Sequence, residues 1–229
     1  MLALILSAAV AFPVTPDCAT LHLMRDVDRS VQPAVPFMLR ARGPHDGKQL
    51  RDAFGTIPNV RTSENFIVKW GRDIDVTETQ AKTVLDAFEY AWGKQVDGMK
   101  FPAPHGTDDY LFNVYIGDSG SGVPGSLGAA GYSTRDPEGW PMIVLAPTVL
   151  WDENYTQDTV AHEFFHAIQD KVGSYGYEAE RGAWYFEATA EWVVGEVYPD
   201  SPQEGSFLAG YAMLPNLPVD FFDYPDEGR

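Results

Sequence analysis

Cysteine is almost missing from the sequence, because Cys18 is the only one among 229 residues. A single thiol cannot form an intrachain disulfide, and it cannot supply a zinc site built on several thiolates. Any metal that this chain binds must therefore be held by histidine and carboxylate side chains. Histidine is scarce too, with five in the chain.

Positive charge is also in short supply. The formal net charge is −17, and residues 1–64 contain seven Lys and Arg against six Asp and Glu, whereas residues 65–229 contain nine against 27. Because such a chain cannot neutralise a row of phosphates, we expect no nucleic-acid partner. An acidic surface is instead typical of a soluble protein that tolerates salt or binds cations.

The apolar run at the start of the chain, residues 1–12 (MLALILSAAVAF), is too short to cross a bilayer as a helix, so we expect no stable membrane span. It resembles the core of a signal peptide that ends in small residues around Ala9 and Ala11, although the usual positive n-region is missing. We predict that residues 1–20 are a signal peptide or apolar leader, and that the protein is secreted or extracytoplasmic. A buried N-terminal strand and a wrongly chosen start codon are the alternatives.

Residues 21–64 are rich in Pro, Gly and Arg without periodicity, which predicts a spacer or pro-segment. Regular structure is expected from residue 65 onward. The predicted elements are strands at 65–70 and 110–118, a helix within 76–96 capped by Thr77 and Gln80, a hairpin at 131–147, and two helices that end near Val172 and at 198. This order predicts an α+β fold with a small mixed sheet.

A glycine-rich stretch follows the second strand, and it contains G-x-G-x-x-G at Gly120, Gly122 and Gly125. A dinucleotide site also requires a helix that opens on the last glycine, because the helix N-terminus holds the pyrophosphate. Pro124 and further glycines lie here instead, and no helical pattern appears. We therefore predict a loop and not a cofactor site.

Two of the five histidines lie four residues apart in TVAHEFFHAIQD (159–170), on a helix that we expect Asn154 or Thr156 to cap and Gly173 to end. On a helix, His162 and His166 lie within about 40° of each other, opposite an apolar arc that anchors the helix to the sheet. Two imidazoles one turn apart can bind one zinc ion, and Glu163, about 100° further round, can reach a water on that metal. Solvated histidines in a chance match are the alternative.

A catalytic zinc site takes three protein ligands. No histidine follows His166, so a carboxylate has to be the third ligand, and Glu187 is our choice. Glu187 and Glu191 share one face of an otherwise apolar helix. Two buried carboxylates would cost several kcal/mol each unless a cation compensates them. One Glu can bind the metal while the other accepts the N–H of a ligating imidazole, unless both are simply surface glutamates.

HEFFH at 162–166, a glutamate 21 positions later and an acid four residues further on resemble the gluzincin metallopeptidases, the thermolysin-like and M6-like clan. WYFEATAEW (184–192) is also similar to secreted bacterial metalloproteases of this clan. The specific likeness covers about residues 142–198. It implies a zincin-like catalytic domain over 65–229 that binds one Zn²⁺ through His162, His166 and Glu187, with Glu163 as general base and Glu191 as support for a ligand.

Other features of the clan fit less closely. Its members often carry Asp where this chain has Glu191, and they usually continue into a helical subdomain, whereas this chain ends 42 residues after Glu187. We therefore expect a C-terminally truncated domain. Clan members stabilise the oxyanion with a downstream His or Tyr, for which Tyr198 and Tyr211 are the candidates here, and a packing role is the alternative for each.

In the clan, an edge strand before the zinc helix pairs with an extended peptide substrate. The corresponding residues here are Met142, Ile143, Val144, Leu145 and Ala146, and an interior strand is the alternative for this segment. The sequence thus predicts zinc-dependent hydrolysis of a peptide or protein substrate. A non-catalytic extracellular binding module that retains a zincin fold and a metal-free structural domain are the alternatives.

Overall fold

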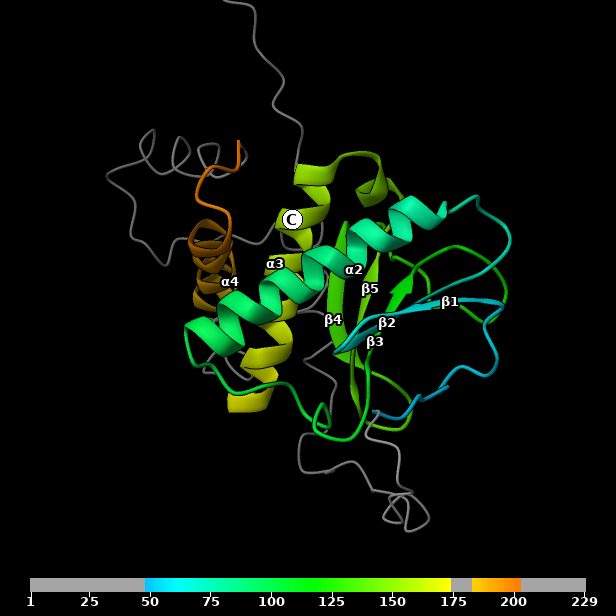
Figure 1. Cartoon of the computed structure of the whole chain (residues 1–229), viewed down its shortest axis with the longest axis horizontal. Helices are drawn as coiled ribbons and strands as arrows, with labels where there is room; N and C mark the ends of the chain where they lie inside the picture. The colour runs from blue at the N-terminus through cyan, green and yellow to red at the C-terminus, as the bar shows by residue number, and fades with distance from the viewer. Residues whose placement is uncertain (1–47, 174–182, 203–229) are drawn as a thin grey trace, which may run out of the picture.

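The computed structural model describes residues 48–173 and 183–202 (Figure 1). In chain order its elements are β1 (Asn59–Thr62), β2 (Phe66–Trp70), α2 (Glu78–Trp92), the π-helical turn η2 (Gly93–Gly98), β3 (Phe112–Ile116), β4 (Gly131–Arg135), β5 (Pro141–Leu145), the 3₁₀ turn η3 (Pro147–Trp151), α3 (Glu153–Val172) and α4 (Ala183–Val197). The predicted leader, residues 1–20, lies outside the described residues, and so does Tyr211.

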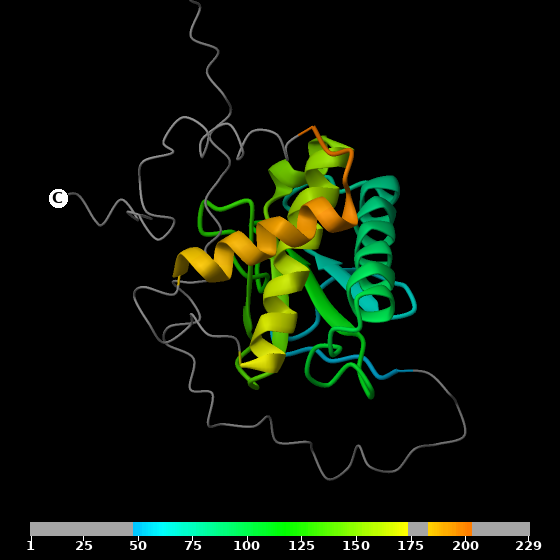
Figure 2. The ribbon, with the colours of Figure 1, turned by 90° about the vertical axis from the view of Figure 1, so that its left-hand side faces the viewer.

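The strands form one mixed sheet in the order β1-β2-β3-β5-β4. The three central strands run parallel, and β1 and β4 are antiparallel to their neighbours at the two edges. The helices α2, α3 and α4 gather on one face of this sheet (Figures 1 and 2). The predicted α+β class with a small mixed sheet is therefore confirmed.

The expectation that residues 142–146 form an edge strand is wrong. β5 contains Met142 to Leu145 and lies between β3 and β4, and Ala146 follows it. Strands that are buried on both faces are typically continuous apolar runs, and every residue of β5 is buried. Within the described part of the chain, β4 is the strand at this edge of the sheet.

The apolar core lies between the sheet and the helices, and Phe164 of α3 is at its centre with no exposed surface. The Phe164 ring lies 5.4–6.4 Å, centroid to centroid, from four other rings: Phe66, Phe88, Trp92 and Phe112. The apolar arc predicted for this helix thus packs on the sheet. Replacing Phe164 by Ala would cost about 3–5 kcal/mol.

The ends of α2 and α3 can be compared with the capping residues that the sequence predicts. Thr77 and Gln80 form the predicted capping box at the start of α2. Gly173, in the left-handed conformation with φ 65°, ends α3 as predicted. Asp152 caps α3, in place of Asn154 or Thr156, because its carboxylate accepts the Tyr155 N–H at 2.9 Å.

Residues 48–64 belong to the folded unit, so the predicted boundary at residue 64 lies too late. β1 pairs with β2, and Ile57 is 6% exposed in a cluster on the other face of the sheet. The fully buried Lys69 donates to the Asp52 carboxylate at 2.6 Å, and Arg51 forms an ion pair with Asp136 at 3.0 Å. These charged contacts hold a segment without periodicity against the sheet.

Residues 117–130 form turns, and no helix opens on Gly125, as predicted for the glycine-rich loop. None of the described helices combines the length and the apolar character that a membrane span needs.

Candidate metal centre

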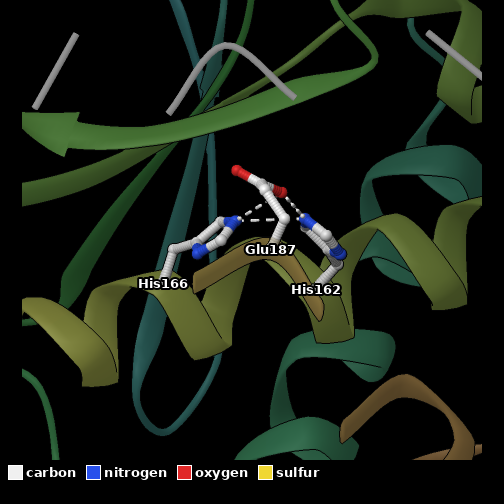
Figure 3. A group of neighbouring side chains, drawn as sticks. All are labelled: His162, His166 and Glu187. Carbon is white, nitrogen blue, oxygen red and sulfur yellow. Dashed lines mark hydrogen bonds and ion pairs between the residues drawn. The ribbon is translucent and has the colours of Figure 1, made fainter. Parts of the chain in front are cut away.

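The histidines of α3 meet a glutamate of α4 because α4 lies across the polar side of α3 (Figure 2). His162 and His166 are one turn apart on α3, and Glu187 comes from the first turns of α4. The packing of α4 also buries residues on the polar side of α3: His166 has no exposed surface, and Gln169 is 3% exposed. The side chains that the sequence predicted to meet therefore do meet (Figure 3).

Three ligand-type atoms form a small triangle. His162 Nε2 lies 3.0 Å from His166 Nε2 and 3.1 Å from Glu187 Oε2, and His166 Nε2 lies 3.4 Å from the same oxygen. Ligands about 2.0–2.1 Å from one metal ion are about 3.3 Å apart in a tetrahedron and about 2.9 Å apart at right angles. The triangle thus has the size of one face of a metal's coordination shell.

The outer hydrogen bonds of the two imidazoles define their tautomers. His162 Nδ1 lies 3.2 Å from Glu191 Oε2, and His166 Nδ1 lies 2.6 Å from Gln169 Oε1. Both partners are oxygen acceptors, so both Nδ1 atoms carry the hydrogen when the rings are neutral. Both Nε2 lone pairs then point toward the carboxylate of Glu187.

Glu187 brings negative charge into this cluster. Burial alone would raise the pKa of Glu187, but the positive charge and the hydrogen bonds that His166 and His162 supply when they are protonated outweigh burial and hold its pKa well below the ordinary value. Glu187 Oε1 is buried and has no hydrogen-bond partner among the described residues. When both rings are neutral, by contrast, three lone pairs converge and repel one another unless a cation or protons lie between them, so these residues fit a divalent metal ion.

Glu163 follows His162 in sequence, and its side chain lies between α3 and the edge strand β4. It is 2% exposed and packs against the first residue of β4: a Cβ on Gly131 would be 2.9 Å from Glu163 Cγ and 3.2 Å from Glu163 Oε1. Only glycine leaves room for the carboxylate at this position.

A buried ion pair joins the other end of β4 to α3. Arg135 donates to both carboxylate oxygens of Asp170, at 3.2 and 3.1 Å, and the Asp170 side chain is 2% exposed. The bidentate geometry and the contact at Gly131 together hold β4 alongside the histidine helix at two points.

Tyr198 does not reach the site. It follows α4 by one residue, about 16 Å beyond Glu187 along the helix axis. Its ring stacks on Tyr90 of α2 at 5.2 Å, and burial raises the pKa of Tyr198. The predicted oxyanion role of Tyr198 is therefore wrong, because the side chain serves packing at the far end of the helix. The role of Tyr211 stays a prediction.

Sequence reasoning missed two residues of the site. Gln169 holds His166, and the Phe186 ring stacks on the His166 ring with centroids 4.3 Å apart and an interplanar angle of 8°. The spacing of Gln169, three residues after His166 on the same helix, is a signal that was available. Phe186 carries no comparable signal, because its contact depends on how α4 crosses α3.

The fold and the site together define an α+β protein with a candidate centre of two histidines and one carboxylate for a metal ion. The chain belongs to the Family of unknown function (DUF6055), whose profile matches residues 45–215. No curated protein and no solved structure matches the chain.

Proposed function

We propose that this chain is a zinc-dependent peptidase of the gluzincin type. The observation that carries the proposal is the convergence of His162 Nε2, His166 Nε2 and Glu187 Oε2 within 3.4 Å, with Glu163 next in sequence to the first histidine. Two imidazoles and one glutamate are a ligand set of catalytic zinc, and the set leaves a position open.

The chemistry divides between the metal and the chain. When bound, zinc supplies Lewis-acid activation of a water molecule and of the scissile carbonyl. Glu163 accepts the proton of the attacking water and returns it to the leaving amine. Gly131 leaves room for this carboxylate beside β4.

An extended substrate would lie along β4, which takes the role that the sequence assigned to residues 142–146. Two observations support this placement: β4 is at the edge of the described sheet, and it packs against the histidine helix. The apolar residues 1–20 support a secreted or extracytoplasmic enzyme.

The test is hydrolysis of casein and of a peptide library by the purified chain, with a chelator and then with zinc restored. We expect turnover that the chelator removes and zinc restores. Glu163→Gln should reduce turnover by about 10²–10⁴-fold and leave the zinc content unchanged, because Glu163 does not bind the metal. Activity in the chelator, or an active Glu163→Gln variant, would refute the mechanism. Stoichiometric zinc without turnover would instead support the non-catalytic binding module.

A further inference from the structure

Gln169 has every polar atom of its side chain engaged at the junction of α3 and α4. Its Oε1 lies 2.6 Å from His166 Nδ1, and its Nε2 donates to the Phe186 carbonyl at 2.9 Å and to Thr189 Oγ1 at 2.8 Å. A backbone carbonyl only accepts, and the Thr189 hydroxyl donates to the Tyr185 carbonyl at 2.7 Å. The amide nitrogen must therefore face α4, and the amide oxygen must face His166.

The orientation of the Gln169 amide determines the tautomer of the His166 imidazole. An acceptor fixed 2.6 Å from His166 Nδ1 keeps the hydrogen on Nδ1 and the lone pair on Nε2, on the side of Glu187. The two histidines have different partners: His162 faces the Glu191 carboxylate, whose side chain is 29% exposed, whereas the fully buried His166 faces a neutral amide. A neutral acceptor avoids a further buried negative charge close to Glu187.

Gln169 also holds the helix that carries the third ligand. Its two acceptors, at Phe186 and Thr189, lie on either side of Glu187 in sequence. The same side chain thus orients one ligand on α3 and positions the segment of α4 that presents another.

We propose that Gln169 is a positioning residue that determines the His166 tautomer and positions Glu187, so that the three ligands are assembled before the metal binds. The inference rests on the metal site of the proposed function but not on the peptidase activity. It predicts that Gln169 controls metal affinity through two separable roles. Its amide oxygen accepts a hydrogen bond from His166, and its amide nitrogen donates to α4.

Three variants of the full chain test these two roles separately. Gln169→Met loses both, Gln169→Glu keeps an acceptor for His166 but loses the donors to α4, and Gln95→Met is the matched control. Gln95 is also fully buried and donates to the α3 backbone, at the Ala161 carbonyl, 2.9 Å away, and among the described residues no hydrogen bond joins it to a candidate ligand.

Zinc affinity is measured by competition with a chromophoric chelator. We expect a 10–100-fold loss in Gln169→Met, a loss of less than tenfold in Gln169→Glu, and a change of less than threefold in Gln95→Met. The inference is overturned if Gln169→Met stays within threefold of the parent chain, or if Gln95→Met loses as much. A Gln169→Glu variant as weak as Gln169→Met would overturn the role in the tautomer.

The tautomer is also read directly, by long-range ¹H–¹⁵N NMR of the metal-free protein at pH 8. We expect the hydrogen of His166 on Nδ1 in the parent chain and a mixture of tautomers in Gln169→Met. A hydrogen on Nε2 in the parent chain would overturn the inference. Because this readout needs neither zinc nor turnover, its failure is distinguishable from failure of the proposed function.

Discussion

Chelation should lower the thermal midpoint of this protein, because the ligands of the proposed zinc come from two helices that must separate on unfolding. Zinc at 100 times its Kd stabilises the folded state by about 2.7 kcal/mol. For a domain of about 150–250 residues, each kcal/mol corresponds to about 2–4 °C. The expected fall is therefore about 5–11 °C, measured by calorimetry with and without chelator.

The variant Glu187→Gln distinguishes zinc binding at Glu187 from a general stabilising effect of metal ions. In the metal-free protein at pH 8, where an ordinary imidazole is neutral, the Glu187 carboxylate faces two lone pairs at 3.1 and 3.4 Å, and within the described part of the chain its Oε1 has no hydrogen-bond partner. A glutamine side chain of the same size brings an N–H₂ donor into that position. Relief of an unsatisfied buried group is worth about 1–3 kcal/mol, so the metal-free variant should melt at or above the metal-free parent.

Zinc should then leave the midpoint of Glu187→Gln almost unchanged, because the variant lacks the anionic ligand. A zinc-induced rise as large as that of the parent chain would show that Glu187 does not bind the metal. A parent chain whose midpoint is indifferent to both zinc and chelator would refute the coupling between metal and helix packing.

Two further predictions concern the attachment of β4 to α3. Gly131→Ala should lower peptide turnover at least tenfold and leave the zinc content unchanged, because the added Cβ, 2.9 Å from Glu163 Cγ, displaces the carboxylate. Gly93→Ala is the control, and it should match the parent in the same assay because nothing lies within 4 Å of its new Cβ. Arg135→Met should reduce the free energy of unfolding, measured in urea, by about 3–5 kcal/mol, because it leaves the buried Asp170 carboxylate unpaired. Full activity of Gly131→Ala, or an unchanged urea midpoint in Arg135→Met, would contradict these contacts.

The helices and the two histidines were predictable because their signals are local, whereas the contacts of Gln169 and Phe186 with His166 were not. A helix places residues four apart on one face, so His162 and His166 follow from spacing alone. Glu187 was chosen as the third candidate ligand on energetic grounds, since a buried carboxylate on an otherwise apolar helix is costly without a compensating cation. The capping box at Thr77 is likewise a short-range pattern.

Strand order and the start of the folded unit were not predictable in the same way. A hairpin indicates that β4 and β5 pair, but which of them also pairs with β3 depends on contacts far apart in the chain. The apolar run of β5 was the one hint, since interior strands are continuously apolar. Residues 48–57 have no periodicity, and their attachment through Arg51 and Lys69 is visible only in three dimensions.

Zinc K-edge X-ray absorption of the purified chain tests most directly whether His162, His166 and Glu187 form a zinc site. We expect one zinc per chain with two imidazole nitrogens and carboxylate or water oxygens at about 2.0–2.1 Å, and no sulfur. A spectrum with fewer than two imidazoles, or a protein that holds no zinc at all, would contradict the site.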